Sequence, residues 1–204
     1  MTENLSSASA KAALRRELLA ARRALSPRDR EGAAAALAVR ALGLPELAGA
    51  ATVAAYVSVG SEPGTRELLD ALRAAGKRVL LPLLLPDNDL DWAPYEGPGS
   101  LAAAAHPGKM QLWEPTGPAL GPDAVAGADA VLLPGLAVDR RGVRLGRGGG
   151  SYDRVLARLE RAGSSAALVV LLYDDEVVAH VPEEPHDHPV RAVATPSGVV
   201  RFSS

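Results

Sequence analysis

The sequence contains no cysteine among its 204 residues, which excludes disulfides, a thiolate nucleophile and a cysteine-ligated metal site. Aromatic residues make up only 3%, so the core has to be built mainly from leucine, valine and alanine. No hydrophobic run is long enough to span a bilayer, and the first residues lack the continuous apolar segment of a signal peptide. We therefore expect a soluble, cytoplasmic protein.

The charges are nearly balanced. The 22 lysines and arginines oppose 24 aspartates and glutamates, for a formal net charge of -2. This balance gives no reason to expect a nucleic acid or a membrane surface as a partner, although local basic clusters could serve a phosphate-bearing small molecule. The length suits one domain, and we find no repeat or linker. Residues 1–204 are expected to form a single domain in which residues 1–9 are a disordered leader.

Short apolar runs alternate with stretches of helical periodicity. Ser9 as a cap, Pro27 at a first helical position and Gly76 after a helix indicate helix boundaries. The predicted helices cover residues 9–25, 27–42 and 62–75, and a further helix follows a glycine-rich run. The predicted strands cover residues 51–57, 78–82, 90–95 (more exposed), 129–134, 166–173 and 191–195, with an ordered surface excursion at 97–121. This alternation predicts an α/β sandwich with a largely parallel sheet.

The first predicted helix has a hydrophobic stripe with basic side chains beside it. The stripe consists of Leu14, Leu18, Ala21 and Leu25. Three basic side chains border this stripe when successive residues are placed about 100° apart around the helix. They are Lys11, Arg15 and Arg22. These side chains could reach inward to a bound nucleotide; the alternative is a charged helix edge in solvent.

A glycine-rich run follows a predicted buried strand. It reads Arg144-Leu-Gly-Arg-Gly-Gly-Gly-Ser-Tyr-Asp153 and opens a helix at Ser151 or Tyr152. Backbone N–H groups at a helix start, with no Cβ in the way, form a ready phosphate site. Arg144 and Arg147 can add bidentate hydrogen bonds to phosphate oxygens. The carboxylate of Asp153, in the first helical turn, could hold Mg²⁺ against those phosphates.

Two familiar nucleotide-binding motifs are absent. A Walker A motif needs a lysine followed by serine or threonine, and no lysine in the chain has that neighbour. The Rossmann pattern fails because Gly146-x-Gly148 is followed at the third glycine position by Ser151. The alternative interpretation of the run is a flexible turn with its arginines in solvent. The arginines, the helix start and Asp153 together favour phosphate binding.

Two nearby segments form a long and specific signature. They read Leu133-Pro-Gly-Leu-Ala-Val-Asp139 and Gly142-Val-Arg-Leu-Gly-Arg-Gly-Gly-Gly-Ser-Tyr-Asp-Arg154. This signature resembles that of the 5-formyltetrahydrofolate cyclo-ligase (methenyltetrahydrofolate synthetase) family. Shorter similarities fall in the family's order along nearly the whole chain. They are Lys11-Ala-Ala-Leu-Arg15, Tyr56-Val-Ser-Val-Gly-Ser-Glu62, Glu114-Pro115, Asp187 and Thr195-Pro196.

The resemblance implies an enzyme that uses ATP and Mg²⁺ to cyclise 5-formyltetrahydrofolate to 5,10-methenyltetrahydrofolate, releasing ADP and phosphate. In that family ATP phosphorylates the formyl oxygen, the neighbouring folate nitrogen attacks the activated carbon, and phosphate leaves. Such chemistry requires positioning and charge neutralisation rather than a protein nucleophile. The resemblance also implies a monomer with a three-layer α/β/α sandwich and a largely parallel, mixed sheet, similar to the NagB/RpiA/CoA-transferase-like fold.

The resemblance assigns roles to individual residues. The implied ATP-binding residues are Lys11, Arg15, Arg144, Gly146, Arg147, Gly148, Gly149, Gly150, Ser151 and Tyr152. The implied folate-binding residues are Val57, Glu62, Arg147, Gly148, Gly149, Gly150 and Ser151. Asp153 and Asp187 are the implied Mg²⁺ carboxylates, and Arg147 and Asp153 the implied catalytic residues. Without the resemblance, Glu62 would be interpreted as a first-turn helix residue and Val57 as part of the core.

The chain departs from the family pattern at three places. Ser151 and Val138 stand where relatives usually have tyrosine and phenylalanine, and Leu83 begins a segment where many have a basic residue. All three changes are expected on the folate side of the site. They leave open a non-catalytic folate- or nucleotide-binding relative of the family. A third hypothesis is an enzyme of similar fold with another phosphorylated or acyl substrate.

Overall fold

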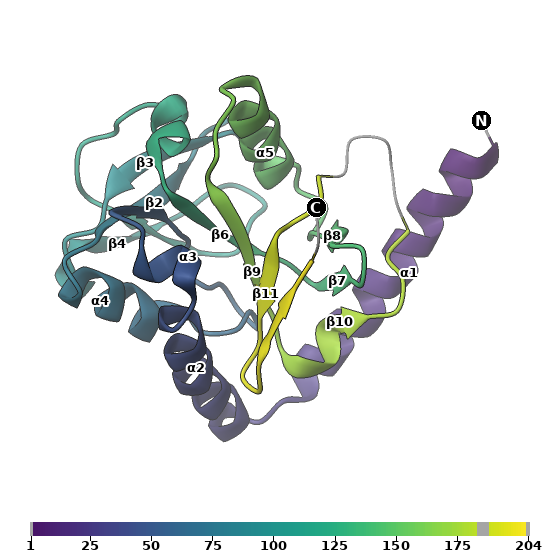
Figure 1. Cartoon of the computed structure of the whole chain (residues 1–204). Coiled ribbons are helices and arrows are strands. Elements are labelled where there is room, and N and C mark those ends of the chain that lie inside the picture. Colours follow the sequence, from purple (N-terminus) through teal and green to yellow (C-terminus); the bar gives the residue numbers. More distant parts are fainter. Residues whose placement is uncertain (1, 183–187, 203–204) are drawn as a thin grey trace.

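The fold is organised around one mixed β-sheet (Figure 1). The computed structural model describes residues 2–182 and 188–202. Its main sheet is 7-stranded, with the order β12-β11-β9-β6-β1-β2-β3. The strands from β11 to β2 pair in parallel, whereas β12 and β3 join the two edges antiparallel. The strands are β1 (Thr52–Ala54), β2 (Arg78–Leu84), β3 (Leu90–Pro94), β6 (Ala130–Pro134), β9 (Ala167–Leu171), β11 (Ala192–Ala194) and β12 (Val199–Arg201).

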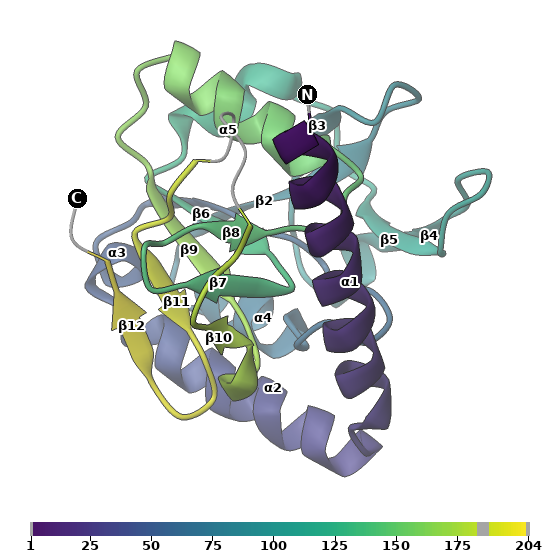
Figure 2. The ribbon, with the colours of Figure 1, turned by 90° about the vertical axis from the view of Figure 1, so that its right-hand side faces the viewer.

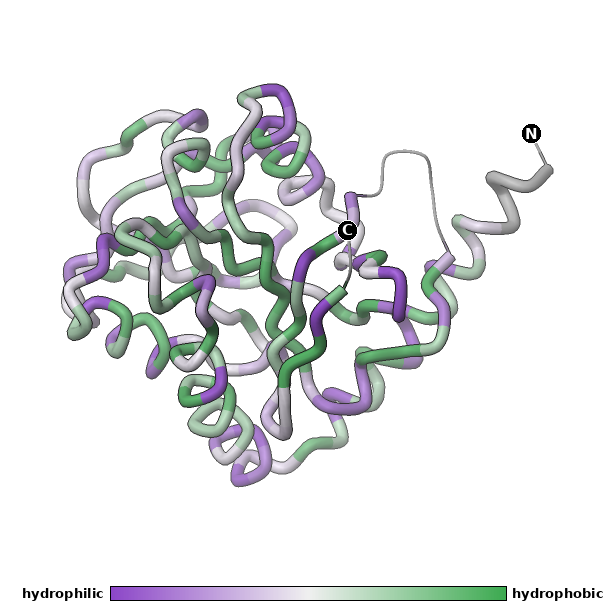
Figure 3. Tube along the Cα trace, viewed as in Figure 1, coloured by the Kyte–Doolittle hydropathy of each residue, from purple (hydrophilic) through white to green (hydrophobic). Residues whose placement is uncertain are grey.

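Helices cover both faces of this sheet, which confirms the predicted three-layer sandwich (Figure 1). Along β1, Val53 packs into the cluster on one face and Ala54 into the cluster on the other, as the alternation of a strand requires. Figure 3 shows hydrophobic residues concentrated along the central strands. One face carries α2 (Pro27–Leu42), α3 (Pro45–Ala48) and α4 (Arg66–Ala74); the other carries α5 (Ser151–Arg161) and the 3-10 helix η2 (Pro122–Gly127).

Helix α2 begins and ends where the sequence predicted. The hydroxyl oxygen of Ser26 accepts the N–H of Asp29 at 3.1 Å, Pro27 occupies the first helical position, and Gly43 ends the helix. The start of α4 differs from the prediction, because this helix begins at Arg66 rather than at Glu62. Glu62 therefore belongs to the loop before the helix, and the first-turn interpretation of this residue is wrong.

Helix α1 (Thr2–Ala24) packs against a small sheet with the order β10-β7-β8 (Figure 2). The helix begins at Thr2, well before the predicted start at Ser9. Leu18 lies in a hydrophobic cluster with residues of the small sheet, but Ala21 of the predicted stripe is exposed. Arg22 is buried instead, with 1% of its surface exposed. The small-sheet strands are β7 (Ala137–Asp139), β8 (Arg144–Leu145) and β10 (Val177–Val178).

The excursion at residues 97–121 contains a two-stranded hairpin, formed by β4 (Leu101–Ala104) and β5 (Leu112–Pro115) after the short η1 (Pro98–Ser100). The neighbouring strand β3 is not the exposed strand that the sequence suggested, since Trp92 is fully buried. Among the helices of the described chain, none combines the length and apolar character that a membrane span requires.

Candidate functional site

A cavity of about 340 Å³ lies where the carboxyl ends of the parallel strands β1, β2 and β6 meet. This is the edge of an open α/β sheet where ligands usually bind, and the volume suits a small molecule. The cavity brings together most of the site residues predicted from the sequence. They are Val57, Glu62, Arg144, Gly146, Arg147, Gly148, Gly149, Gly150, Ser151, Tyr152 and Asp153.

The glycine-rich loop connects β8 to α5 along one wall of the cavity. Gly148 has φ +90° and Gly150, which caps α5, has φ +77°, both in the left-handed region where a side chain is strained. Helix α5 then begins at Ser151, and the N–H groups of its first turn have no partner within the helix. The loop and the helix start are therefore shaped to receive an anion.

Helix α1 contacts this loop through the side chain of Arg15. Arg15 donates a hydrogen bond from Nε to the carbonyl oxygen of Gly146 at 2.9 Å, and its guanidinium lies against Gly148. Lys11 lies one turn earlier in α1 and is 95% buried, with 5% of its surface exposed. Neither side chain lines the cavity. The structure thus brings Arg15 to the predicted loop, but not to the cavity surface.

Arg144 links the strand end to the start of α5. Its Nη1 donates to the carbonyl oxygen of Pro134 at 3.0 Å, and its Nη2 to Asp153 Oδ1 at 3.1 Å. Arg144 is buried, whereas the side chain of Asp153 is half exposed at 52%. The ion pair holds the Asp153 carboxylate beside the glycine-rich loop, at the rim of the cavity.

The described chain contains no group of three side chains that could hold a metal by themselves. A Mg²⁺ ion that bridges protein and phosphates needs only one or two protein carboxylates, with the remaining positions filled by phosphate and water oxygens. Asp153 fits that requirement, since its side chain is half exposed beside the glycine-rich loop. Asp187, the second predicted carboxylate, lies outside the described residues.

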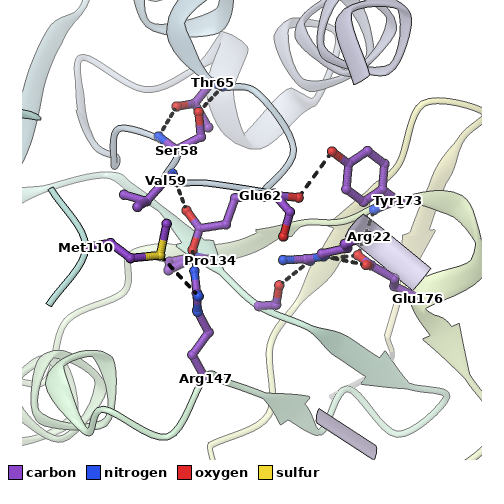
Figure 4. Close-up of polar contacts among 12 residues, drawn as sticks. Arg22, Ser58, Val59, Glu62, Thr65, Met110, Pro134, Arg147, Tyr173 and Glu176 are labelled. Carbon is purple, nitrogen blue, oxygen red and sulfur yellow. Dashed lines mark hydrogen bonds and ion pairs between the residues drawn. The ribbon is translucent and has the colours of Figure 1, made fainter. Parts of the chain in front are cut away.

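Glu62 lies on the opposite wall, on the loop that follows β1 (Figure 4). Its Oε2 accepts the backbone N–H of Val59 at 2.8 Å, and its Oε1 lies 3.4 Å from Arg147 Nη1. Burial raises the pKa of the Glu62 carboxyl above its ordinary value of 4.5, because this hydrogen bond and the charges of Arg147 and Arg22 offset only part of the desolvation. A buried carboxylate of this kind recognises ligand N–H donors.

The β4–β5 hairpin provides a further wall of the cavity, which no sequence pattern indicated. Met110 and Trp113 line the cavity, and the sulfur of Met110 lies 3.8 Å from Arg147 Nη2. Glu114 Oε1 accepts the N–H of Leu84 at 2.9 Å, which attaches β5 to the end of β2. The Glu114-Pro115 similarity indicated this region, but no local pattern indicated that a distant hairpin faces the glycine-rich loop.

The structure corrects one expectation about the departures from the family pattern. Val138, in β7, is fully buried in the hydrophobic core and does not line the cavity. The expectation that valine at this position removes an aromatic wall from the ligand site is therefore wrong. Ser151 does line the cavity, as does Tyr152. Aromatic lining is supplied by Tyr56, Trp113 and Tyr152.

Comparisons with known proteins agree on one family. The sequence model of the 5-formyltetrahydrofolate cyclo-ligase family matches residues 7–196. A 5-formyltetrahydrofolate cyclo-ligase of Mycolicibacterium smegmatis is 44% identical over 196 residues, which cover 93% of this chain and 96% of the relative. The enzyme of that name from Escherichia coli is 33% identical, over 87% of this chain and 96% of its own.

The similarity extends to a solved structure. The NMR structure of the Aquifex aeolicus 5,10-methenyltetrahydrofolate synthetase superposes with a TM-score of 0.79 at 27% identity, covering 95% of this chain and 93% of that protein. A 5,10-methenyltetrahydrofolate synthetase from Mycoplasma pneumoniae has the same fold, with a TM-score of 0.69 at 20% identity.

Fold and site together define a single-domain α/β enzyme in which a glycine-rich loop at a helix start and a buried carboxylate face one cavity. The family match spans most of the chain, and two relatives exceed 30% identity over nearly their whole length. The chain therefore belongs to the 5-formyltetrahydrofolate cyclo-ligase family, a family of ligases.

Proposed function

We propose that this protein catalyses the ATP- and Mg²⁺-dependent cyclisation of 5-formyltetrahydrofolate to 5,10-methenyltetrahydrofolate, with release of ADP and phosphate. The observation that carries the proposal is that Glu62 and the glycine-rich loop line the same cavity, with Arg147 of that loop 3.4 Å from Glu62. A group recognised at the carboxylate and a phosphate recognised at the loop can meet in such a cavity. We further propose that the protein acts as a cytoplasmic monomer.

The chemistry is a phosphoryl transfer followed by a ring closure. The formyl oxygen attacks the γ-phosphorus of ATP and ADP leaves, which turns the formyl oxygen into a phosphate ester. The neighbouring folate nitrogen then attacks the formyl carbon and loses its proton. The carbon–oxygen bond breaks, and inorganic phosphate departs with the former formyl oxygen. Both steps need alignment and neutralised phosphate charge rather than a protein nucleophile.

The folate is proposed to occupy the half of the cavity that includes Val57 and Glu62. The ionised Glu62 would accept hydrogen bonds from the N–H donors of the pterin ring. Tyr56, Trp113 and Tyr152 line the cavity and offer ring faces against a flat heterocycle. This placement directs the formyl group towards Arg147 and the loop.

The phosphates of ATP are proposed to lie along the loop from Gly146 to Tyr152. The N–H groups at the start of α5 and the guanidinium groups of Arg144 and Arg147 neutralise the charge on the transferring phosphoryl group. Arg15 contacts the loop from α1, and Arg15 and Lys11, one turn earlier in the same helix, are proposed to contribute to ATP binding from that side.

The metal is proposed to bind between the phosphates and the carboxylate of Asp153. Mg²⁺, when bound, neutralises phosphate charge and orients the γ-phosphate. Asp153 would hold the ion, and the ion pair with Arg144 would keep that carboxylate aimed at the loop. Asp187 is proposed as a second ligand from a segment outside the described residues.

The decisive experiment is a turnover assay with 5-formyltetrahydrofolate, ATP and Mg²⁺, monitored by the strong absorbance of the methenyl product. A reaction in which a non-hydrolysable ATP analogue replaces ATP is the control. Formyl oxygen labelled with ¹⁸O should appear in inorganic phosphate. Absence of product at enzyme concentrations near that of the substrate would contradict the proposal, and binding without turnover would indicate the non-catalytic relative.

A further inference from the structure

The last turn of α1 carries a charged side chain that is almost completely buried. Arg22 is 1% exposed and forms a bidentate ion pair with Glu176, with Nε 2.6 Å from Oε1 and Nη2 2.8 Å from Oε2. Its Nη2 also donates to the carbonyl oxygen of Gly135 at 2.6 Å. Glu176 lies in the 3-10 helix η3 (Asp174–Glu176), and Gly135 directly follows β6. The guanidinium is therefore fixed by two elements far from α1 in sequence.

Stability does not explain this arrangement well. A buried ion pair often contributes no more than well-packed apolar side chains of the same volume, because both charges must be desolvated. Within the described chain, Nη1 of Arg22 is buried and has no hydrogen-bond partner, which adds a further cost. The ring of Tyr173 stacks 5.6 Å from the guanidinium, and its hydroxyl donates to the carbonyl oxygen of Ser61 at 3.4 Å. Through Tyr173, the Arg22–Glu176 ion pair is thus connected to Ser61, the residue next to Glu62.

Figure 4 shows the guanidinium of Arg22 between the side chains of Glu176 and Glu62. The side chains that interact electrostatically with Glu62 come from several elements. They are Arg22 of α1, Arg147 of the glycine-rich loop, Tyr56 after β1, Tyr152 of α5 and Tyr173 after β9. Burial raises the pKa of all three tyrosines, so they stay neutral near neutral pH. The positive charges among these side chains are those of Arg22 and Arg147.

These two arginines differ in how firmly they are held. Arg147 is 38% exposed, and its contact with Glu62 is long at 3.4 Å, so solvent screens much of the attraction. It also belongs to the loop that is proposed to bind the phosphates. When Arg147 turns to a phosphate, its charge is shared with a strong anion. Arg22 is held in place instead, because Glu176 accepts from its Nε and Nη2 and Gly135 accepts from Nη2 as well.

We infer that Arg22 is a positioning residue for Glu62: held by Glu176 and Gly135, its guanidinium is the permanent counter-charge that keeps Glu62 ionised and in place while Arg147 engages the nucleotide. This role rests on the proposed function, in which Glu62 contacts the folate. It assigns a task to a buried arginine that touches neither substrate. It also explains why a charge, rather than a leucine, occupies this buried position of α1.

A direct test is a ¹³C NMR titration of the glutamate carboxyl carbons in the ligand-free protein, with Glu62 assigned by its absence in Glu62→Gln. Arg22→Met is expected to raise the pKa of Glu62 by at least about 0.5 unit, because an opposite charge is removed. Glu176→Gln breaks the same ion pair but leaves the positive charge, so the pKa of Glu62 should stay or fall. Arg23→Met changes the exposed neighbour in α1 and should leave the titration unchanged.

Both single variants disrupt the same buried ion pair, but they are expected to change the pKa of Glu62 in different ways. Comparing them therefore separates an electrostatic effect from structural damage. An unchanged or lowered pKa of Glu62 in Arg22→Met, or an equal rise in both variants, overturns the inference. Thermal unfolding identifies a variant that does not fold. If Arg22→Met fails to fold, Glu176→Gln still decides, because a raised pKa of Glu62 there would contradict the permanent counter-charge.

Enzyme kinetics supply the functional readout. The acidic limb of kcat/KM for 5-formyltetrahydrofolate should move to higher pH in Arg22→Met by about the same amount as the titration of Glu62, and should not do so in Glu176→Gln. A purely structural role would lower activity without moving that limb, and this result would overturn the inference. If the unmodified protein shows no turnover, the proposed function has failed, whereas the NMR titration still tests the role of Arg22.

Discussion

Arg15 of α1 donates a hydrogen bond from Nε to the carbonyl oxygen of Gly146 at 2.9 Å, although 131 residues separate the two positions. Its guanidinium also lies against Gly148, which has φ +90°. The N-terminal helix is thereby part of the scaffold that shapes the glycine-rich loop. Because the loop is the proposed ATP site, α1 influences nucleotide binding without lining the cavity.

Replacement of Arg15 by methionine should weaken ATP binding. The lost hydrogen bond and charge correspond to about 1–2 kcal/mol at a half-buried position, or roughly a 5- to 30-fold loss of kcat/KM for ATP. The KM for the folate should change much less. Steady-state kinetics with varied ATP test this expectation, with Arg16→Met, an exposed neighbour in α1, as the matched control. Equal effects of the two substitutions would contradict it.

Replacement of Glu62 by glutamine should lower activity and slightly stabilise the protein. The amide lacks the charge that holds the pterin donors, so kcat/KM for the folate should fall about 10- to 100-fold. The folded-state pKa of Glu62 lies above its ordinary value of 4.5, so its ionisation opposes folding once the pH exceeds that value. The variant should therefore be more stable than the unmodified protein at pH 7.

This gain should vanish below pH 4.5, where Glu62 is protonated in both the folded and the unfolded state. Urea unfolding at several pH values measures the difference, and Glu67→Gln, which changes an exposed glutamate of α4, is the control. A variant less stable than the unmodified protein at pH 7 would show that the ionised carboxylate is a net stabiliser.

Replacement of Asp153 by asparagine should raise the Mg²⁺ concentration that gives half-maximal activity. The neutral amide is a weaker magnesium ligand and no longer forms an ion pair with Arg144, so an increase of about 10-fold or more is expected. Activity measured against Mg²⁺ at fixed ATP tests this. Asp175→Asn, at an exposed aspartate, should leave the Mg²⁺ dependence unchanged. An unaltered Mg²⁺ dependence in Asp153→Asn would exclude this residue as a ligand.

Replacement of Asp139 by asparagine should destabilise the protein at neutral pH. Asp139 is fully buried and accepts the N–H groups of Arg141, Val143 and Val181, together with the guanidinium of Arg141. Desolvation raises the pKa of this carboxyl, but these hydrogen bonds outweigh it and the pKa lies below its ordinary value of 3.8. The substitution should cost about 3 kcal/mol of unfolding free energy.

The pH dependence of this cost follows from the direction of the shift. A carboxyl with a lowered folded-state pKa stabilises the protein above its unfolded-state pKa, and this contribution is lost as the pH falls through the folded-state value. The difference between Asp139→Asn and the unmodified protein should therefore shrink below pH 3.8. Urea unfolding at pH 7 and near pH 3 measures it, and a difference that stays constant would contradict the role of the charge.

Local signals in the sequence predicted several elements well. The cap at Ser26, Pro27 and Gly43 determines both ends of α2, because capping and backbone restriction act within a few residues. Buried apolar runs predicted the parallel strands, and the glycines before Ser151 predicted the start of α5. These features depend on neighbours in the chain, so they can be derived without a fold.

Other features needed the tertiary structure. The sequence placed Ala21 on the buried face of α1, but the packing of this helix against the small sheet exposes Ala21 and buries Arg22. The partner of Arg22, Glu176, is 154 residues away, and no local pattern identifies it. The hairpin wall at Trp113 likewise reaches the cavity through packing of β5 against β2.

The sequence by itself determined the class of fold and located the glycine-rich loop at a helix start, because helix caps, strand hydrophobicity and glycine conformations are local properties. It also identified Glu62 and Asp153 through their resemblance to a known family. Only the tertiary structure decided which charges are buried together, that Arg147 of the loop lies 3.4 Å from Glu62, and that Arg22 lies near Glu62 on another side. Those relationships depend on desolvation and on contacts between distant segments, which exist only once the chain has folded.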